Sequence, residues 1–435
     1  MAAEVERKTF AAYLGRFSVL LAGRVLGALA LFAVNLLIVR YLGTEALAGY
    51  AVFTSMVSVL AICLFLGFNS VASIFASRYQ ATGNPDLLKG FAVSAIRNGL
   101  LASLVLTLGL FAVWAFAADL VTNQTLAHSG IVLLTAAGAA ALGLNGAIQV
   151  GLKRPATGLL PDTLVRPVIM LAGTAALLFG QLAGDVSAIY GMACIAVWLA
   201  LLSVFVIDAD FLRGYQKVAT RTETARWHRA ALPWMGTSLL WDYMIDLVLL
   251  ITSLFAGAVE LAMLHVAFRY RVLAGFGMRT IHTLFMPEIT ENSANNNKTM
   301  MRRKIRQANF ASLGYSLLVL IGFVVLGRWL FDLFSLDAGE GLPILLVISL
   351  TMVIRATFGP APLILAVHNS HLATLAVSFC GFLFAALWLW IFYPAHGIMA
   401  AAIGYSAANF CVSACLWIYA RKKTGIDSSI FASAK

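Results

Sequence analysis

Charged residues are scarce in this sequence. Only 11% of its 435 residues are Asp, Glu, Lys or Arg, while 61% are hydrophobic. Soluble domains carry about 25% charged residues, so the composition excludes a surface that faces water throughout. Apolar runs of membrane-spanning length recur from end to end, and the mean hydropathy is +0.90. Together these features indicate a helical membrane protein with many spans.

Cysteine is also scarce, and its placement argues against a redox or metal role. The five cysteines all fall inside apolar runs, and none has metal-ligand spacing with histidine. The short loop HNSH contains His368 and His371, but two histidines alone do not make a metal site. We therefore expect no cofactor and no bound metal.

The sequence lacks the usual marks of an enzyme. The loops predicted to face outward are short, with no paired carboxylates and no Ser/His/Asp arrangement. No glycine-rich phosphate-binding loop follows a strand, which argues against ATP hydrolysis. The amino-terminal MAAEVERKTFAAYLGR has no cleavage site of the signal-peptide kind, so the first span is expected to be retained.

About twelve helical spans are predicted, each long enough to cross about 30 Å of hydrocarbon. The first six lie at 17–38, 46–75, 91–118, 127–150, 157–180 and 186–207. The second six lie at 232–255, 259–286, 308–334, 341–366, 371–393 and 396–420.

Lysine and arginine gather in alternate loops. The opposite loops TNQTLAHS, GQLAGDVS, AGAVE and YPAHG contain neither residue. By the positive-inside rule, both termini are expected in the cytoplasm. The net charge is +11, and the lysines and arginines responsible for it lie in alternate loops. Membrane topology therefore accounts for the charge, and no nucleic-acid partner is expected.

A basic connector at 208–231 is predicted to separate two six-helix lobes, 1–207 and 232–435. Two halves with an even number of spans begin and end on the same side, as parallel repeats do. Shifting the sequence by 214 residues aligns Gly43 with Gly257, Leu47 with Leu261, Ala48 with Ala262 and Val52 with Val266. The expected fold is all-α, with two lobes related by a pseudo-two-fold axis.

Ionisable side chains inside the predicted spans are the candidate functional residues. A central Arg or Asp costs about 2.5–3.5 kcal/mol on insertion scales, so each needs a partner or a water-filled cavity. In LLWDYMIDLVLL, Asp242 and Asp246 are four residues apart and are predicted to share a helix face. Asp246 and Arg269 are expected at similar depth. We hypothesise that they pair, either as a structural ion pair or as part of proton coupling.

Arg24 and Arg355 are predicted to face a cavity, because no acidic residue at the same depth is evident. Arg355 precedes GPAP at 359–362. Its prolines leave backbone groups without their helical hydrogen bonds, so these groups need partners within the protein or in a water-filled cavity. Guanidinium groups match phosphate oxygens, so these arginines are candidates to bind a pyrophosphate or an acidic sugar. The full predicted substrate-binding set is Arg24, Arg269, Arg355, Asn35, Asn145 and Gln149.

Three other arginines receive different interpretations. Arg40 and Arg279 are expected to anchor the membrane interface. Arg271 lies two positions from Arg269, so at most one of the two should face a narrow cavity.

The elbow RYLGTEALAGY at 40–50, between the first two spans, resembles the start of polysaccharide flippases. The residues that carry the resemblance are Arg40, Tyr41, Leu42, Gly43, Glu45, Ala48, Gly49 and Tyr50. LFLGFNSVASIFASRY at 64–79 is also similar to that family. These O-antigen and exopolysaccharide flippases are part of the MOP (multidrug/oligosaccharidyl-lipid/polysaccharide) exporter superfamily. The close resemblance covers about the first hundred residues. The second half departs from it, because Leu254 stands at the position that the shift of 214 residues aligns with Arg40.

The resemblance implies a MATE-like, two-lobed helical shell around a cavity that opens alternately to either side of a bacterial inner membrane. It implies transport of undecaprenyl-pyrophosphate-linked oligosaccharide from the cytoplasmic to the periplasmic leaflet. A polysaccharide polymerase, chain-length proteins, membrane lipids and a coupling proton or sodium ion are the implied partners. Two alternatives stay open. One is a cation-coupled multidrug exporter, which would favour an acidic cavity, and the other is a membrane glycan polymerase or ligase.

Overall fold

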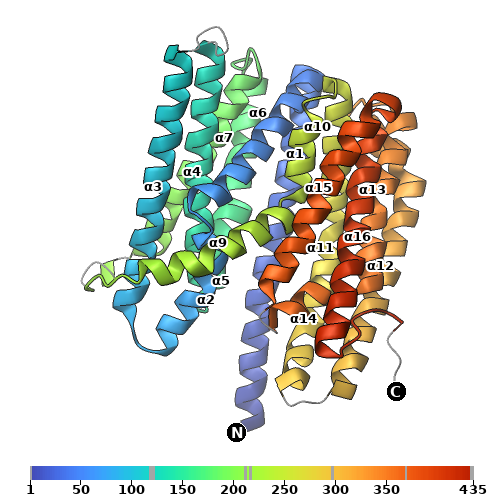
Figure 1. Ribbon diagram of the computed structural model, residues 1–435. Helices are drawn as coiled ribbons and strands as arrows, with labels where there is room; N and C mark the ends of the chain where they lie inside the picture. Colours follow the sequence, from blue (N-terminus) through green and yellow to red (C-terminus); the bar gives the residue numbers. More distant parts are fainter. Residues whose placement is uncertain are drawn as a thin grey trace. The chain divides into compact units, whose positions relative to one another are not determined.

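The computed structural model describes residues 2–116, 123–209, 213–214, 218–294, 298–367 and 370–431. Only the backbone is described at 2–18, 116, 123–125, 282–284, 286–294, 298–299, 363, 366–367 and 371. Every regular element in these ranges is a helix, which confirms the predicted all-α membrane fold (Figure 1). The chain divides into two compact units, Met1–Ser238 (unit 1) and Leu239–Lys435 (unit 2).

Unit 1 contains the helices of the first half. They are α1 (Ala2–Leu64), α2 (Phe68–Ala81), α3 (Pro85–Phe116), α4 (Asn123–Gly151), α5 (Pro155–Leu160), the π-helix η1 (Pro161–Val165), α6 (Arg166–Phe179), α7 (Val186–Ile207) and most of α9 (Thr224–Trp241). Unit 2 contains the remainder. They are α10 (Met244–Thr252), α11 (Ala258–Ala294), α12 (Lys298–Asp332), α13 (Ala338–Phe358), α14 (Ala361–Val367), α15 (His371–His396) and α16 (Ile398–Thr424).

In the described residues, nine helices are long and apolar enough to cross a membrane, and the bent pair α9–α10 makes a tenth. The apolar part of α1, Val19–Leu64, has 46 residues and is long enough for two spans. The 37-residue α11 is also of spanning length, but its arginines lower its apolar character. Two spans from α1 and one from α11 account for the predicted number of about twelve.

The two spans of α1 meet at the elbow identified in the sequence. Gly43 has φ +88° and ψ 178°, a backbone conformation that is open to glycine and costly for other residues. Tyr41 packs on Phe179 at the end of α6, whereas Phe53 stacks on Tyr190 at the start of α7. Both partners lie beside the same α6–α7 loop, so the chain reverses at Gly43. Figure 1 shows the two arms of α1.

The predicted connector is partly built into unit 1. Trp227, near the start of α9, is fully buried, and its Nε1 donates a hydrogen bond to the Tyr79 hydroxyl at 2.8 Å. The indole also packs edge-on against Phe91. These contacts hold the first part of α9 against α2 and α3, and unit 1 extends to Ser238, beyond the predicted connector.

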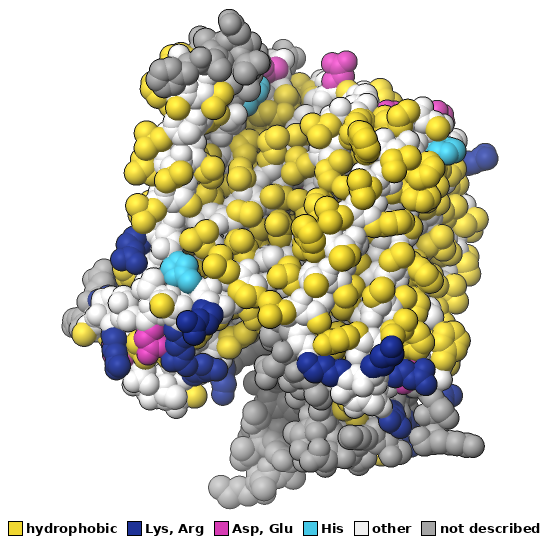
Figure 2. Space-filling model, viewed as in Figure 1, with side chains coloured by type: hydrophobic (Ala, Val, Ile, Leu, Met, Phe, Trp, Pro, Cys, Tyr) yellow, Lys and Arg dark blue, Asp and Glu magenta, His cyan; other side chains and the backbone are white. Residues whose placement is uncertain are grey.

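In both units, apolar side chains cover the sides of the helices, and lysine and arginine gather mainly at one end (Figure 2). Exposed Leu, Val and Phe side chains along α3, α7 and α12 would be costly in water. In hydrocarbon they are the expected lipid-facing surface.

Candidate functional site

Two helices of the second half are broken where ionisable residues occur. Between α9 and α10 the direction changes by 62°, and Asp242 and Tyr243 form the break. The prediction that Asp242 and Asp246 share one helix face is therefore wrong. Asp246 lies in the first turn of α10, whereas Asp242 lies before that helix begins. The break places the carboxylate of Asp242 at a helix end and not along a continuous apolar span.

The second break follows Arg355. Helix α13 ends at Phe358, and the chain continues through Gly359 and Pro360 into α14. Gly359 has φ +71° and ψ −166°, a region that only glycine adopts readily. The predicted single span at 341–366 is interrupted here, because Pro360 cannot continue the hydrogen-bonding pattern of α13.

Arg355 lies in the last turn of α13 and makes two contacts through its guanidinium. Its Nη2 donates a hydrogen bond to Oδ1 of Asn409 in α16 at 3.1 Å. Its guanidinium lies 4.7 Å from the centre of the Trp241 ring, within range of a cation–π interaction. Its Nε is buried and has no hydrogen-bond partner. One donor of a charged group is thus left unsatisfied inside unit 2.

Other charged side chains act electrostatically on Arg355. They are Arg271, Asp242 and Arg279. Arg271 also reaches α13 directly, since its Nε donates to Oγ1 of the buried Thr351 at 3.4 Å. We call Arg271, Arg279, Arg355 and Asp242 the arginine cluster, which joins three guanidiniums with one carboxylate within unit 2.

The hypothesised pair between Asp246 and Arg269 is not present. Arg269 instead donates from Nε to Nε2 of His265, one turn away on α11, at 3.3 Å. Of the two neighbouring arginines, Arg271 joins the cluster and Arg269 does not, which the sequence alone could not decide. Arg279, interpreted as an interface anchor, contributes to the same electrostatic field.

The predicted residues of unit 1 do not form one site. Arg24 is exposed on α1, and Asn35 is buried and donates to the Leu31 carbonyl at 2.6 Å. Gln149 donates from Nε2 to Oδ2 of Asp208 at 2.7 Å, and Arg154 Nη2 binds the other oxygen of that carboxylate at 2.5 Å. Gln149 therefore belongs to a buried polar group with two residues that the sequence analysis did not select. Asn145, one turn earlier on α4, is treated below.

Unit 1 also contains an ion pair that sequence reasoning missed. In the continuous span Pro155–Phe179, which comprises α5, η1 and α6, Asp162 Oδ1 and Arg166 Nε lie 2.9 Å apart. Their spacing of four residues was the available signal. π-helical turns of this kind are frequent at functional sites.

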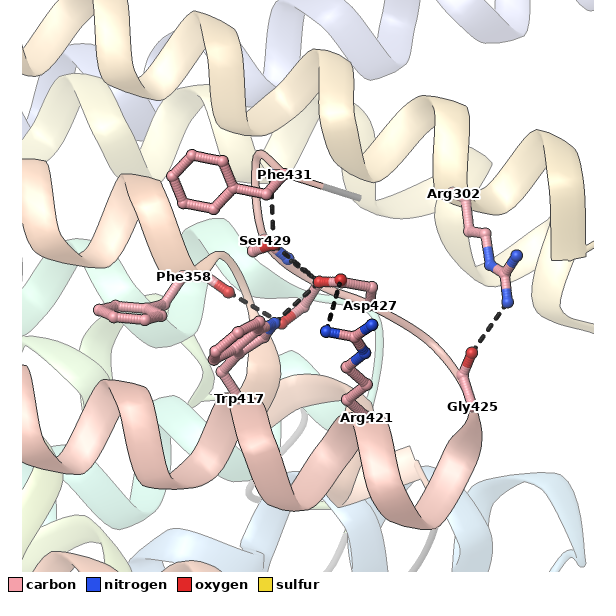
Figure 3. Close-up of polar contacts among 9 residues, drawn as sticks. Arg302, Phe358, Trp417, Arg421, Gly425, Asp427, Ser429 and Phe431 are labelled. Atoms are coloured by element: carbon pink, nitrogen blue, oxygen red, sulfur yellow. Dashed lines mark hydrogen bonds and ion pairs between the residues drawn. The ribbon is translucent and has the colours of Figure 1, made fainter. Parts of the chain in front are cut away.

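A carboxy-terminal segment closes the second break. Residues 425–431, the strap, fold back along the ends of α12, α13 and α16 (Figure 3). Ile430 N donates to the Thr357 carbonyl at 3.0 Å, and Ser428 Oγ donates to the Phe358 carbonyl at 2.8 Å. These are among the last carbonyls of α13, which have no partner within the helix. The strap therefore satisfies the helix end that carries Arg355.

The strap is itself held by Asp427. Trp417 Nε1 donates to its carboxylate at 2.8 Å, and Ser429 donates from both N and Oγ, at 3.0 and 2.7 Å (Figure 3). Arg421 Nη1 lies 3.7 Å from the other carboxylate oxygen. Burial raises the pKa of Asp427, but these donors and the arginine outweigh it, and the pKa lies below its ordinary value.

No group of three or more His, Cys, Asp or Glu side chains capable of holding a metal occurs among the described residues. His368 and the side chain of His371 lie outside them.

Solved structures share this fold. An inward-facing MATE family transporter of the MOP superfamily matches with a TM-score of 0.72 and 15% identity, over 92% of this chain and 94% of that chain. A MOP superfamily transporter from Pyrococcus furiosus matches with a TM-score of 0.66 and 14% identity, over 94% and 95%. A mutant MATE transporter from Vibrio cholerae matches with a TM-score of 0.65 and 18% identity, over 95% and 97%.

No protein-family model matches the chain. No curated protein matches it either. The structural matches identify the class: a multi-span membrane protein with the fold of MATE transporters, as the resemblance implied.

Proposed function

We propose that the chain is an alternating-access transporter that moves undecaprenyl-pyrophosphate-linked oligosaccharide from the cytoplasmic to the periplasmic leaflet of a bacterial inner membrane. In this proposal the arginine cluster of unit 2 binds the pyrophosphate. The observation that supports it is the buried Nε of Arg355, left without a partner beside two further guanidiniums.

The electrostatics favour an anionic ligand. Two guanidiniums, those of Arg271 and Arg279, repel the charge of Arg355, while the carboxylate of Asp242 attracts it. A pyrophosphate supplies several acceptor oxygens in the geometry that a guanidinium fork binds, and it neutralises the excess positive charge. The buried guanidinium of Arg355 is costly at membrane depth unless such a partner is available.

The backbone around the cluster is of the kind found at transporter sites. Discontinuous helices expose backbone groups that bind substrates and ions near the middle of the membrane. Here Asp242 lies in one break, and Arg355 lies in the turn before the other. The breaks also allow local backbone movement, which an alternating-access cycle requires.

A multidrug exporter is the second candidate, because the same fold serves MATE transporters. For the Pyrococcus furiosus transporter, reverse polarity of the binding pocket suggests a different function. The same reasoning applies here, since a cluster with more arginines than carboxylates is unfavourable for a cationic drug. Asp242 is the feature that favours the exporter.

The test is transport by purified protein in proteoliposomes that contain fluorescent undecaprenyl-pyrophosphate oligosaccharide. Movement between leaflets is followed by protection of the sugar from an impermeant reagent. Arg355→Ala and Arg271→Ala should each reduce the flipping rate by about 10- to 100-fold, the value of a hydrogen bond to a charged group. Arg355→Lys should recover only part of the rate, because lysine keeps the charge but not the fork.

Arg328→Ala is the matched control, because Arg328 is an exposed arginine of α12 outside the cluster. It should transport at the wild-type rate. Proton-driven export of a cationic dye, with no movement of the lipid-linked sugar, would replace the flippase by the multidrug exporter.

A further inference from the structure

Unit 1 contains a crevice of about 430 Å³ that is separate from the arginine cluster. It lies between α3, α4 and α7, and α4 packs against both of the other helices. Small side chains at Ala92, Ala137 and Ala141 leave the space, while Leu100 and Phe205 border it and are more than half exposed. A volume of this size falls in the range of about 300–1,000 Å³ typical of small-molecule sites.

One end of this apolar crevice carries unsatisfied polar atoms. Asn145 Nδ2 and Gln149 Oε1 are buried without a hydrogen-bond partner, and both residues line the crevice. Gln149 is 1% exposed, and because its Nε2 donates to Asp208, its free atom is the carbonyl oxygen. One donor and one acceptor are thus left unsatisfied beside the crevice, one helical turn apart on α4.

The crevice has the length and polarity of a lipid in one leaflet. Lys89 and Ser103 mark its extent on α3, about 21 Å apart at about 1.5 Å per residue. One leaflet contributes about half of the ~30 Å hydrocarbon thickness, so the crevice covers a lipid chain and part of its headgroup. Lys89 lies near the start of α3 and Gln149 near the end of the following helix α4, so the headgroup belongs at the end of the crevice that they line.

We propose that this crevice binds one phosphatidylglycerol-type phospholipid of the leaflet at the basic end of the helices. The acyl chain lies along α3 and α7. Lys89, whose Nζ also donates a hydrogen bond to the Val218 carbonyl at 2.6 Å, provides the positive charge for the phosphate. Asn145 Nδ2 donates to a phosphate or ester oxygen. Gln149 Oε1 accepts from a headgroup hydroxyl, which phosphatidylglycerol has and phosphatidylcholine lacks. The site stands apart from the transport proposal, because it requires no oligosaccharide.

The test is native mass spectrometry of protein released from nanodiscs that contain equal amounts of phosphatidylglycerol and phosphatidylcholine. Wild-type protein should retain one phosphatidylglycerol. Asn145→Leu should reduce retention about fivefold, the value of one hydrogen bond. Asn145 makes no hydrogen bond to the rest of the described chain, so this variant should fold normally, which thermal unfolding checks. Ala141→Trp fills the crevice and should abolish retention.

Leu134→Trp is the control for the larger side chain. Leu134 is exposed on the same helix but does not line the crevice. It should retain the lipid as wild type does. Equal retention in all four proteins would mean nonspecific boundary lipid only and would overturn the proposal. Retention of phosphatidylcholine equal to that of phosphatidylglycerol would overturn it as well.

Discussion

At the scale of single residues, Asp427 illustrates how donors decide the charge state of a half-buried carboxylate. Burial alone would raise its pKa, yet Trp417, Ser429 and Arg421 together keep the pKa below its ordinary value. A carboxylate whose pKa is lowered on folding stabilises the folded state above its unfolded pKa, about 3.9. That contribution is lost as the pH falls through the folded pKa.

Asp427→Asn should therefore destabilise unit 2 at pH 7, by about 1 kcal/mol, because asparagine keeps one acceptor but loses the charge. The difference from wild type should begin to shrink once the pH falls below the unfolded pKa of about 3.9, and it should disappear only below the lowered pKa of Asp427 in the folded state, where the wild-type carboxylate is also protonated. Thermal unfolding in detergent at several pH values measures both effects.

Asp332→Asn provides the comparison, since Asp332 is an exposed carboxylate at the end of α12. It should change stability little at any of these pH values. A destabilisation by Asp427→Asn that stays constant from pH 7 to pH 3 would show that the charge is not what holds the strap.

Which arginines gather in unit 2 was only partly predictable. The sequence identified Arg355 from its depth and its position before GPAP, and the structure leaves its Nε without a partner. It did not separate Arg269 from Arg271, because the rotation of a helix that is apolar on most sides is set by packing against its neighbours. The spacing from Arg279 does not separate them either, because Arg269 and Arg271 both lie about 80° from Arg279 around α11 at 3.6 residues per turn.

At the scale of helices, the break after Arg355 depends on Gly359. A Cβ at this position would overlap the Ser428 carbonyl oxygen in the strap, in addition to the strain of its φ and ψ angles. Gly43 has nearly the same angles, but a Cβ there would meet nothing within 4 Å. An alanine at position 43 would therefore suffer backbone strain only, whereas an alanine at position 359 would suffer both strain and steric overlap.

Gly43→Ala should destabilise the protein by about 1–3 kcal/mol through strain alone. Gly359→Ala should cost about 1–3 kcal/mol more, because the strap must move to make room. Thermal unfolding of both variants measures the difference. Equal losses would mean that the strap moves away at no cost and does not fix the end of α13.

The sequence predicted the existence of the spans better than their continuity. Apolar length is a property of composition, so the all-α membrane fold could be predicted from runs of residues. The breaks at Asp242 and Gly359 depend on local contacts, and for Asp242 neither glycine nor proline marks the position. A pattern of two aspartates four residues apart looked like a helix face, because the period alone does not reveal where a helix ends.

At the scale of the whole molecule, the membrane topology follows from charge. The last turn of α16 contains Arg421, Lys422 and Lys423, and the α6–α7 loop contains no lysine or arginine. The positive-inside rule then puts the α2–α3 loop and the carboxy terminus in the cytoplasm. Each unit must obey the rule separately for the two halves to be parallel repeats.

Single cysteines in a background without the five natural ones test this arrangement. The positions chosen are exposed, one at each end of each unit: Gln80→Cys and Gly184→Cys in unit 1, Lys422→Cys and Gly257→Cys in unit 2. In intact cells, an impermeant maleimide should label the cysteines at 184 and 257 only. After the membrane is opened, all four should react.

The two units can fail this test independently, which makes it informative. If the labelling showed both units in the opposite orientation, the positive-inside rule would not hold for this protein. The direction of the proposed transport would then be reversed as well. If only unit 2 were reversed, an odd number of crossings would separate the halves, and they would be inverted repeats. The arginine cluster would keep its local contacts in either case, because all of its members lie within unit 2. Topology therefore decides which leaflet would load the cluster in the proposed transport, and the charge pattern predicts the cytoplasmic one.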